Sequence, residues 1–146
     1  MKKIALICGS VYGAAEQVAS EAASMLRTLG YDSRLFTDAK LDDVLAYLPD
    51  IWLVVTSSTG QGDIPDNLFP FYLDVQNRFP LLTGKQFAVI ALGDSSYEHF
   101  CGAGEKFREL LLEIQGTEHT AMLRIDACET LEPETIALPW LKQHFG

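Results

Sequence analysis

The sequence lacks long apolar runs and is poor in cysteine. No uninterrupted apolar stretch approaches the roughly 20 residues that a bilayer-spanning helix needs, and the first apolar run, residues 4–8, is too short for a signal peptide. The 3 cysteines are an odd and widely spaced set without metal-ligand spacing: Cys8, Cys101 and Cys128. We therefore expect no disulfide framework, no metal site and a reducing cytoplasm as the location.

Positive charge is also scarce. Against 20 Asp+Glu the chain has 11 Lys+Arg, which gives a formal net charge of -9. An anionic protein repels phosphates, which argues against nucleic acids and membranes as partners and permits basic proteins. The alternative is that the acid excess only keeps the protein soluble. The 3 histidines suggest no triad with a nucleophile, so no catalysis by side chains is expected.

The rest of the composition is that of an ordered globular protein. The 146 residues are 48% hydrophobic and 21% charged, with 11 glycines and 6 prolines. A chain of this length can bury roughly two-thirds of the surface of its unfolded form. We expect a single domain over residues 1–146, without repeats or linkers.

Short apolar, β-branched runs alternate with amphipathic stretches of helical period, which is typical of a parallel sheet covered on both faces. The predicted strands are residues 3–8, 33–36, 51–57, 86–92 and 121–125. The predicted helices are residues 14–29, 41–48, 66–78, 104–114 and 133–145. Gly30 and Gly116 are placed to end the first and fourth helices, and Pro139 predicts a kink or a late start in the last.

The first, third and fourth predicted strands are the most continuously apolar and should be central, whereas residues 31–36 partly alternate and suit an edge. This pattern predicts an α/β fold, an open three-layer sandwich whose five-stranded parallel sheet has the order 2-1-3-4-5. In such sheets ligands bind beyond the carboxyl ends of the strands, where the strand order reverses. Chemistry is therefore expected in the loops after the first, third and fourth strands.

The loop after the first strand, residues 9–15, consists of small and hydroxyl-bearing residues that lead directly into a helix. Its backbone N–H groups, the Ser10 hydroxyl and the positive end of the helix dipole suit a phosphate. The lysine of GxxxxGK[ST] and the glycines of GxGxxG are missing, so a single phosphate monoester is favoured. The alternative is an ordinary turn, with Ser10 as a cap and Gly13 for tight packing.

The loop after the third strand, residues 56–67, is long and polar, and its two glycines free the backbone for positive φ. Gly60 can present its peptide to a planar ligand without a side chain in the way. Three hydroxyls suit phosphate or polyol oxygens: Ser57, Ser58 and Thr59. The alternative is that the end of this loop only caps the third helix, and Asp66 is expected to do so in either case.

The loop after the fourth strand makes the pattern specific. Residues 91–97, Ala-Leu-Gly-Asp-Ser-Ser-Tyr, followed by Phe100 and Cys101, resemble the isoalloxazine-binding loop of flavodoxins and of the FMN domains of diflavin reductases. Residues 56–63 are similar to the second flavin loop of those proteins, and residues 10–13 to their phosphate loop. The similarity covers essentially the whole chain, and the absence of a long insertion in the fifth strand resembles the short single-domain flavodoxins.

The resemblance implies a flavodoxin-like fold and one FMN, bound non-covalently. The implied cofactor-binding residues are Ser10, Val11, Tyr12, Gly13, Ala14 and Ala15 around the phosphate; Ser57 and Ser58 beside the phosphate and ribityl chain; Thr59, Gly60, Gly62 and Asp63 in the second loop; and Leu92, Gly93, Asp94, Tyr97, Phe100 and Cys101 along the ring. Tyr97 is expected to stack on the ring face, because an aromatic side chain in a polar loop has no apolar neighbours in sequence. A surface tyrosine is the alternative.

Three positions depart from the family pattern. Val11 and Ala15 stand where many relatives have a hydroxyl residue, which puts tight phosphate binding in doubt. Thr59 stands where some relatives carry a second stacking aromatic residue, so one face of the flavin is expected to be less covered.

The implied function is the transfer of single electrons between a basic flavoprotein reductase and downstream redox acceptor proteins, by a monomer. An FMN-dependent NAD(P)H oxidoreductase of the quinone or azo reductase type is the main alternative, although the chain has no second nucleotide motif. A phospho-acceptor receiver domain is excluded, because Gly9, Ser10 and Ser57 stand where it requires acids. A scaffold that has lost its cofactor is a third possibility.

Overall fold

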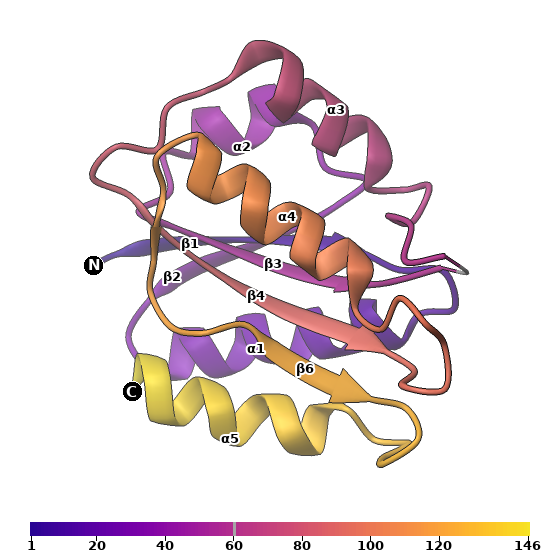
Figure 1. The fold of residues 1–146 in the computed structure, drawn as a ribbon. Helices are drawn as coiled ribbons and strands as arrows, with labels where there is room; N and C mark the ends of the chain where they lie inside the picture. The colour runs from indigo at the N-terminus through magenta and orange to yellow at the C-terminus, as the bar shows by residue number, and fades with distance from the viewer. Residues whose placement is uncertain (60) are drawn as a thin grey trace.

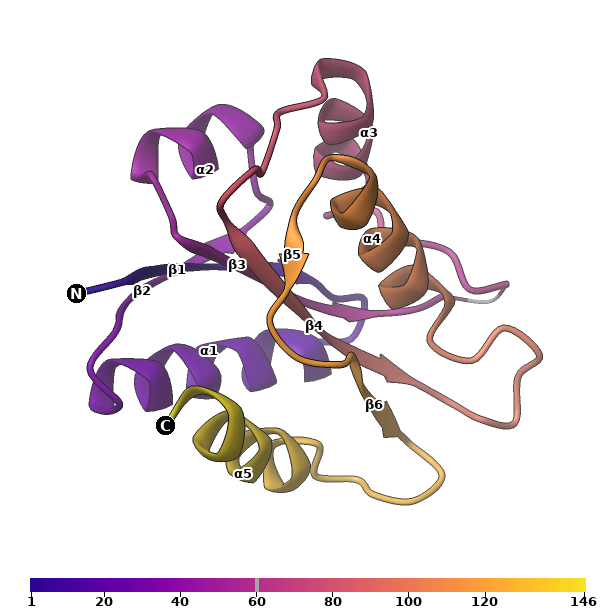
Figure 2. The same cartoon turned by 60° about the vertical axis from the view of Figure 1, so that its left-hand side comes forward.

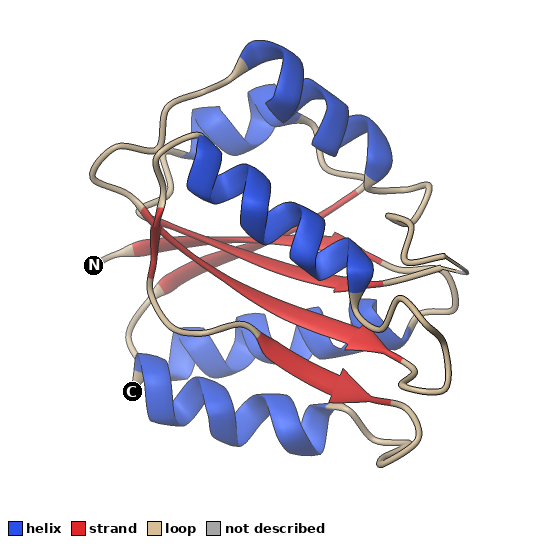
Figure 3. Ribbon diagram, in the orientation of Figure 1, coloured by secondary structure: helices blue, strands red, loops and turns tan. Residues whose placement is uncertain are grey.

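A parallel sheet separates two layers of helices in the computed structural model, which describes residues 1–59 and 61–146 (Figures 1 and 3). The strand order is β2 (Asp32–Thr37), β1 (Lys3–Gly9), β3 (Ile51–Ser57) and β4 (Gln86–Gly93). Beyond β4 lie two short strands, β5 (Thr117–Glu118) and β6 (Leu123–Asp126), which pair with its two ends. The predicted order 2-1-3-4-5 is confirmed, with a sixth strand added.

The burial of each strand follows its sequence. In β1, β3 and β4 nearly every residue is buried, because helices cover both faces and both kinds of side-chain position point into a core. The edge strand β2 alternates between buried and more exposed positions. The central and edge positions predicted for these strands are therefore confirmed.

Two hydrophobic cores lie on opposite faces of the sheet (Figures 1 and 2). On one face pack α1 (Ala14–Thr28) and α5 (Glu134–Phe145), and on the other α2 (Leu41–Tyr47), α3 (Phe69–Arg78) and α4 (Gly102–Glu113). The buried stripe of α1 contains Val18, Ala22 and Leu26, spaced for one helix face. Among the described residues no helix is both long and apolar enough to cross a membrane.

Helix ends differ from the prediction at three places. The third helix begins at Phe69 and not at Asp66, because residues 66–68 form a turn in which the N–H groups of Leu68 and Phe69 both donate to the Pro65 carbonyl. No side chain caps this helix in the part of the chain that is described, so Asp66 is not its cap. The left-handed residue after α4 is Gln115 with φ 74°, one position before Gly116. Pro139 lies inside α5, which nevertheless starts at Glu134, so the late start was wrong.

The predicted strand 121–125 was also wrong in extent. The backbone of β4 pairs twice, through Gln86–Phe87 with Thr117–Glu118 and through Ile90–Gly93 with Leu123–Asp126. Thr117 and Glu118 are polar and carry no apolar run, so only the backbone partner that β4 offers makes them a strand.

Candidate functional site

A cavity of about 480 Å³ lies at the carboxyl ends of β1, β3, β4 and β6. This volume is within the range of roughly 300–1,000 Å³ found for small-molecule sites. The residues that line it are Tyr12, Ala14, Ser57, Ser58, Thr59, Leu92, Gly93, Asp94, Tyr97, His99, Phe100, Cys101, Ile125, Ala127, Thr130, Leu131 and Pro133. The walls are mainly apolar and aromatic and include the hydroxyl groups of Ser57, Ser58 and Thr59, a mixture that suits an amphipathic planar ligand.

The loop between β1 and α1 is held by two side chains. The Ser10 N–H donates to Asn67 Oδ1 at 3.1 Å, and the Ser10 Oγ accepts from the Gly13 N–H at 2.9 Å. Gly13 has φ 90°, and a Cβ there would meet no atom within 4 Å, so the glycine serves the left-handed backbone and not tight packing. Gly13 is the residue before the first turn of α1, and no side chain caps that turn in the described structure. The N–H groups of the turn therefore have no partner within the helix.

The loop between β3 and α3 packs against the start of α4. The Ser58 Oγ accepts from the Ala103 N–H at 3.0 Å, so a serine of one loop caps the helix that follows another. Gly62 packs backbone to backbone on Gly102, and a Cβ on Gly102 would lie 2.8 Å from the Gly62 Cα. Gly60 lies outside the described residues. The Asp63 side chain pairs with Lys106, 3.6 Å between Nζ and Oδ1, and does not line the cavity.

The loop between β4 and α4 supplies the largest share of the wall. Tyr97 lines the cavity with 62% of its surface exposed and belongs to neither hydrophobic core. Cys101 is buried in the left-handed conformation, φ 58°, and its thiol donates to the Ala91 carbonyl at 3.5 Å. Burial raises the pKa of the Cys101 thiol to about 11, which keeps it protonated at neutral pH. Gly93 is required beside it, since a Cβ there would lie 2.9 Å from the Cys101 N.

A fourth wall comes from the segment between β6 and α5, which carried no recognisable motif. Ala127, Thr130, Leu131 and Pro133 line the cavity, and Leu131 is 94% exposed. These residues are near the site because β6 pairs with the end of β4 (Figure 2). The sequence pointed to this wall only through the expected strand order: the fifth strand lies beside the fourth, so the segment after it lies near the loop after the fourth.

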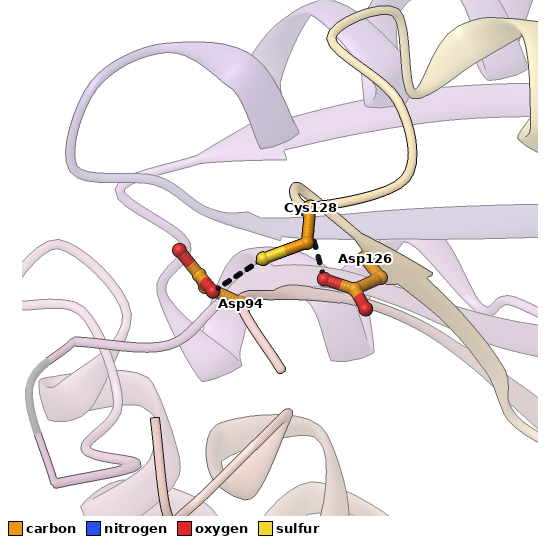
Figure 4. A group of neighbouring side chains, drawn as sticks. All are labelled: Asp94, Asp126 and Cys128. Carbon is orange, nitrogen blue, oxygen red and sulfur yellow. Dashed lines mark hydrogen bonds between the residues drawn. The ribbon is translucent and has the colours of Figure 1, made fainter. Parts of the chain in front are cut away.

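The fourth wall is tied to the β4–α4 loop by two carboxylates and one thiol (Figure 4). The Cys128 Sγ donates to Asp94 Oδ1 at 3.0 Å. Asp126 Oδ1 accepts from the Cys128 N–H at 2.9 Å and, across the two segments, from the Ser95 N–H at 3.1 Å. Hydrogen bonds from Ser96 and from Cys128 lower the pKa of Asp94, so this carboxylate at the cavity is ionised at neutral pH.

The structure brings most of the predicted residues together around one cavity. The predicted residues on its lining are Tyr12, Ala14, Ser57, Ser58, Thr59, Leu92, Gly93, Asp94, Tyr97, Phe100 and Cys101. Those away from the lining are Ser10, Val11, Gly13, Ala15, Gly62 and Asp63. Of these, Ala15 is fully buried in the core beneath α1, whereas Val11 is exposed. His99, Ile125 and the four residues of the fourth wall were not predicted.

Comparison with known proteins decides the family. The model of the flavodoxin family matches residues 6–140. The chain belongs to the flavodoxin family. Its relatives include Flavodoxin YqcA of Escherichia coli, 41% identical over 98% of this chain and 96% of that protein. Protein MioC of Escherichia coli is 39% identical over 97% of this chain and 95% of that protein.

Solved flavodoxin structures share the architecture closely. A C101S mutant of a flavodoxin from Pseudomonas aeruginosa is 46% identical and superposes with a TM-score of 0.94, covering 98% of this chain and 96% of that one. Flavodoxins bind FMN and carry electrons, and this flavodoxin is accordingly an FMN-binding electron carrier.

The residues present fit FMN. The isoalloxazine ring needs an apolar wall with an aromatic face, and Leu92, Phe100 and Tyr97 supply one. The ribityl chain needs hydroxyl partners, which Ser57 and Ser58 offer. A phosphate needs N–H donors, and the uncapped first turn of α1 provides them next to Ala14 on the lining.

Proposed function

We propose that FMN occupies the cavity in the orientation that the family resemblance implies. The phosphate lies at the start of α1, within residues 10–15, the ribityl chain lies along Ser57 and Ser58, and the ring lies against Tyr97. Thr59 borders the ring on one side. Asp94 and the backbone at Cys101 meet the pyrimidine edge. The observation that carries this assignment is the single cavity that three separate loops share at the carboxyl ends of β1, β3 and β4.

The loop residues have distinct duties in this arrangement. Ser10 fixes the first loop, because its Oγ holds the Gly13 N–H and its own N–H is held by Asn67. The N–H groups of Ala14 and Ala15 then remain aimed at the phosphate. FMN supplies the redox chemistry when bound. The protein supplies the apolar wall, the stacking ring and the fixed negative charge of Asp94.

Single electrons then pass between a basic flavoprotein reductase and downstream redox acceptor proteins. The four loops that frame the cavity, residues 10–13, 58–68, 94–101 and 127–133, hold no lysine or arginine. Their carboxylates are Asp63, Asp66, Asp94, Glu98, Glu129 and Glu132. A cavity with such a rim attracts a positively charged partner and orients it on the cofactor.

Two exposed apolar side chains lie inside this acidic rim. Tyr12 is 97% exposed and Leu131 is 94% exposed, and both line the cavity. Apolar residues surrounded by charge are typical of weak, transient contacts between redox proteins. The protein acts as a monomer of one domain, residues 1–146. Its three free thiols suit the reducing cytoplasm, where we place it.

Titration with FMN and with riboflavin tests the orientation. FMN is expected to bind at least about tenfold more tightly, because hydrogen bonds to a charged group contribute about 1.5–3 kcal/mol each. Ser10→Ala should weaken FMN binding and leave riboflavin binding unchanged, whereas Ser20→Ala, on the exposed side of α1, should change neither. Equal affinities for the two flavins would refute the role of residues 10–15.

A further inference from the structure

Asp126 is the last residue of β6, and its carboxylate joins two segments of the cavity wall. Asp126 Oδ1 accepts from the Ser95 N–H at 3.1 Å and from the Cys128 N–H at 2.9 Å. Ser95 belongs to the β4–α4 loop and Cys128 to the β6–α5 segment. One carboxylate oxygen therefore fixes the backbone of both segments at the point where they leave the sheet. Figure 4 shows the bond on the Cys128 side.

The bonds around Asp94 complete the connection from the other side. Asp94 Oδ1 accepts from the Ser96 N–H at 2.9 Å and from the Cys128 thiol at 3.0 Å. The backbone adds a third link, because the Ala127 N–H donates to the Gly93 carbonyl at 2.8 Å. The β4–α4 loop and the β6–α5 segment are thus hydrogen-bonded to each other within the first two residues after β4 and β6.

Both joined segments present residues to the cavity. Asp94 and Tyr97 come from the β4–α4 loop, and Ala127, Thr130 and Leu131 from the β6–α5 segment. Ser95, Tyr97 and Cys128 themselves are exposed, so no hydrophobic packing of these side chains replaces the hydrogen bonds. Backbone N–H groups that donate to a carboxylate are among the stronger hydrogen bonds.

We propose that Asp126 is the positioning residue that holds the β4–α4 loop and the β6–α5 segment together as one wall of the flavin site. This inference rests on the proposed placement of FMN in the cavity. Asp126 does not line the cavity, so its effect on the flavin passes through Asp94 and Tyr97 on one side and Leu131 on the other. Hydrogen bonds from Ser95 and Cys128 also lower the pKa of Asp126, so the acceptor is a carboxylate at neutral pH.

Three substitutions at Asp126 separate the position of the acceptor from its charge. Asp126→Ala removes the acceptor and should weaken FMN binding about tenfold. Asp126→Asn keeps an oxygen in place and loses the charge, so FMN affinity should stay within about threefold of the native value. Asp126→Glu keeps the charge and displaces the oxygen by one methylene, so it should resemble alanine more than asparagine. Asp43→Ala, which removes an exposed carboxylate on α2 away from the cavity, should leave FMN affinity unchanged.

Two readouts distinguish positioning from a general loss of stability. Amide hydrogen exchange in the FMN-free protein should be faster at Ser95 and Cys128 in Asp126→Ala and slow in Asp126→Asn. The visible circular dichroism of bound FMN should change in the alanine variant and return with asparagine. If the alanine variant does not fold, the order of the asparagine and glutamate variants still decides the matter.

Native affinity and native exchange in Asp126→Ala would overturn the proposal. So would asparagine and alanine variants that weaken FMN equally, because charge and not position would then be responsible. Faster exchange with unchanged FMN affinity would also overturn it, since the two segments would be joined without effect on the flavin. Misplacement of FMN in the proposed function is detected separately, by substitution of Tyr97.

Discussion

Replacing Tyr97 by alanine removes the aromatic side chain that we place on the ring of FMN. Tyr97 is 62% exposed and takes no part in either core, so its loss should hardly change the free energy of unfolding of the FMN-free protein. Its backbone N–H donates to the Asp94 carbonyl, a bond that alanine retains. The substitution therefore changes the cavity wall and little else.

The expected magnitude follows from stacking. Aromatic side chains stacked on nucleic-acid bases contribute about 1–3 kcal/mol per base, and the flavin ring is a comparable planar system. A loss of about 2 kcal/mol corresponds to roughly 30-fold weaker FMN binding. If the stacking is about 1–2 kcal/mol weaker on fully reduced FMN than on one-electron-reduced FMN, the second reduction potential should rise by roughly 40–90 mV in the alanine variant, on the scale of about 59 mV per tenfold change for one electron. The rise is expected because the electron-rich ring of Tyr97 disfavours the fully reduced anion, and the alanine variant lacks that ring. The ionised Asp94 also disfavours the anion, but it does so equally in both proteins.

Fluorescence titration gives the affinity and spectroelectrochemistry gives the potentials, both in one variant. Tyr97→Phe is the control, because it keeps the ring and should stay close to native in both quantities. Weaker binding with an unchanged potential would mean that the ring only shields FMN from water. A variant with native affinity and native potential would remove Tyr97 from the site.

Three further predictions concern charge and the thiols. The association rate with a basic NADPH-dependent flavoprotein reductase should fall as the salt concentration rises, because exposed charges are screened over about 8 Å at physiological ionic strength. An association rate independent of salt would refute electrostatic docking. A bulky thiol reagent should modify one cysteine in the native protein and three after unfolding, since Cys128 is exposed and Cys8 and Cys101 are buried. Cys128→Ser should abolish the reaction of the folded protein, and modification of either remaining cysteine in that folded variant would contradict their burial. Burial raises the pKa of the Cys8 thiol from its ordinary 9.0 to about 12. The thiol therefore ionises at lower pH in the unfolded chain than in the folded protein, and the free energy of unfolding should fall as pH rises from 9.0 toward 12. An equally steep fall in Cys8→Ala would refute this.

The fold follows from local patterns wherever an element has a continuous apolar signal. β1, β3 and β4 were predicted within one residue at each end, and α1 from its spaced buried residues and the glycine after it. The strand Thr117–Glu118 was missed because it is polar, and its existence depends on the free edge of β4. The start of the third helix was misplaced, because residues 66–68 form a turn on the Pro65 carbonyl and the Asp66 side chain caps no N–H group there.

The candidate site was likewise predictable only in the parts that carry a local sequence pattern. Three loops could be found because glycines, hydroxyls and Tyr97 follow strand ends in a distinctive order. The fourth wall could not be found, because Ala127, Thr130 and Leu131 carry no motif and reach the cavity only through the pairing of β6 with β4. The hydrogen bond from the Ser95 N–H to Asp126 likewise joins residues 31 positions apart, and no local sequence pattern predicts such a contact.

The central claim, that this flavodoxin carries electrons for protein partners, is tested most directly by stopped-flow reduction of the FMN-loaded protein. Mixing with NADPH alone should leave the absorbance of oxidised FMN unchanged over seconds. Adding a catalytic amount of a basic flavoprotein reductase should bleach it, at a rate that falls as salt rises. Rapid bleaching by NADPH alone would contradict the account and favour an FMN-dependent NAD(P)H oxidoreductase.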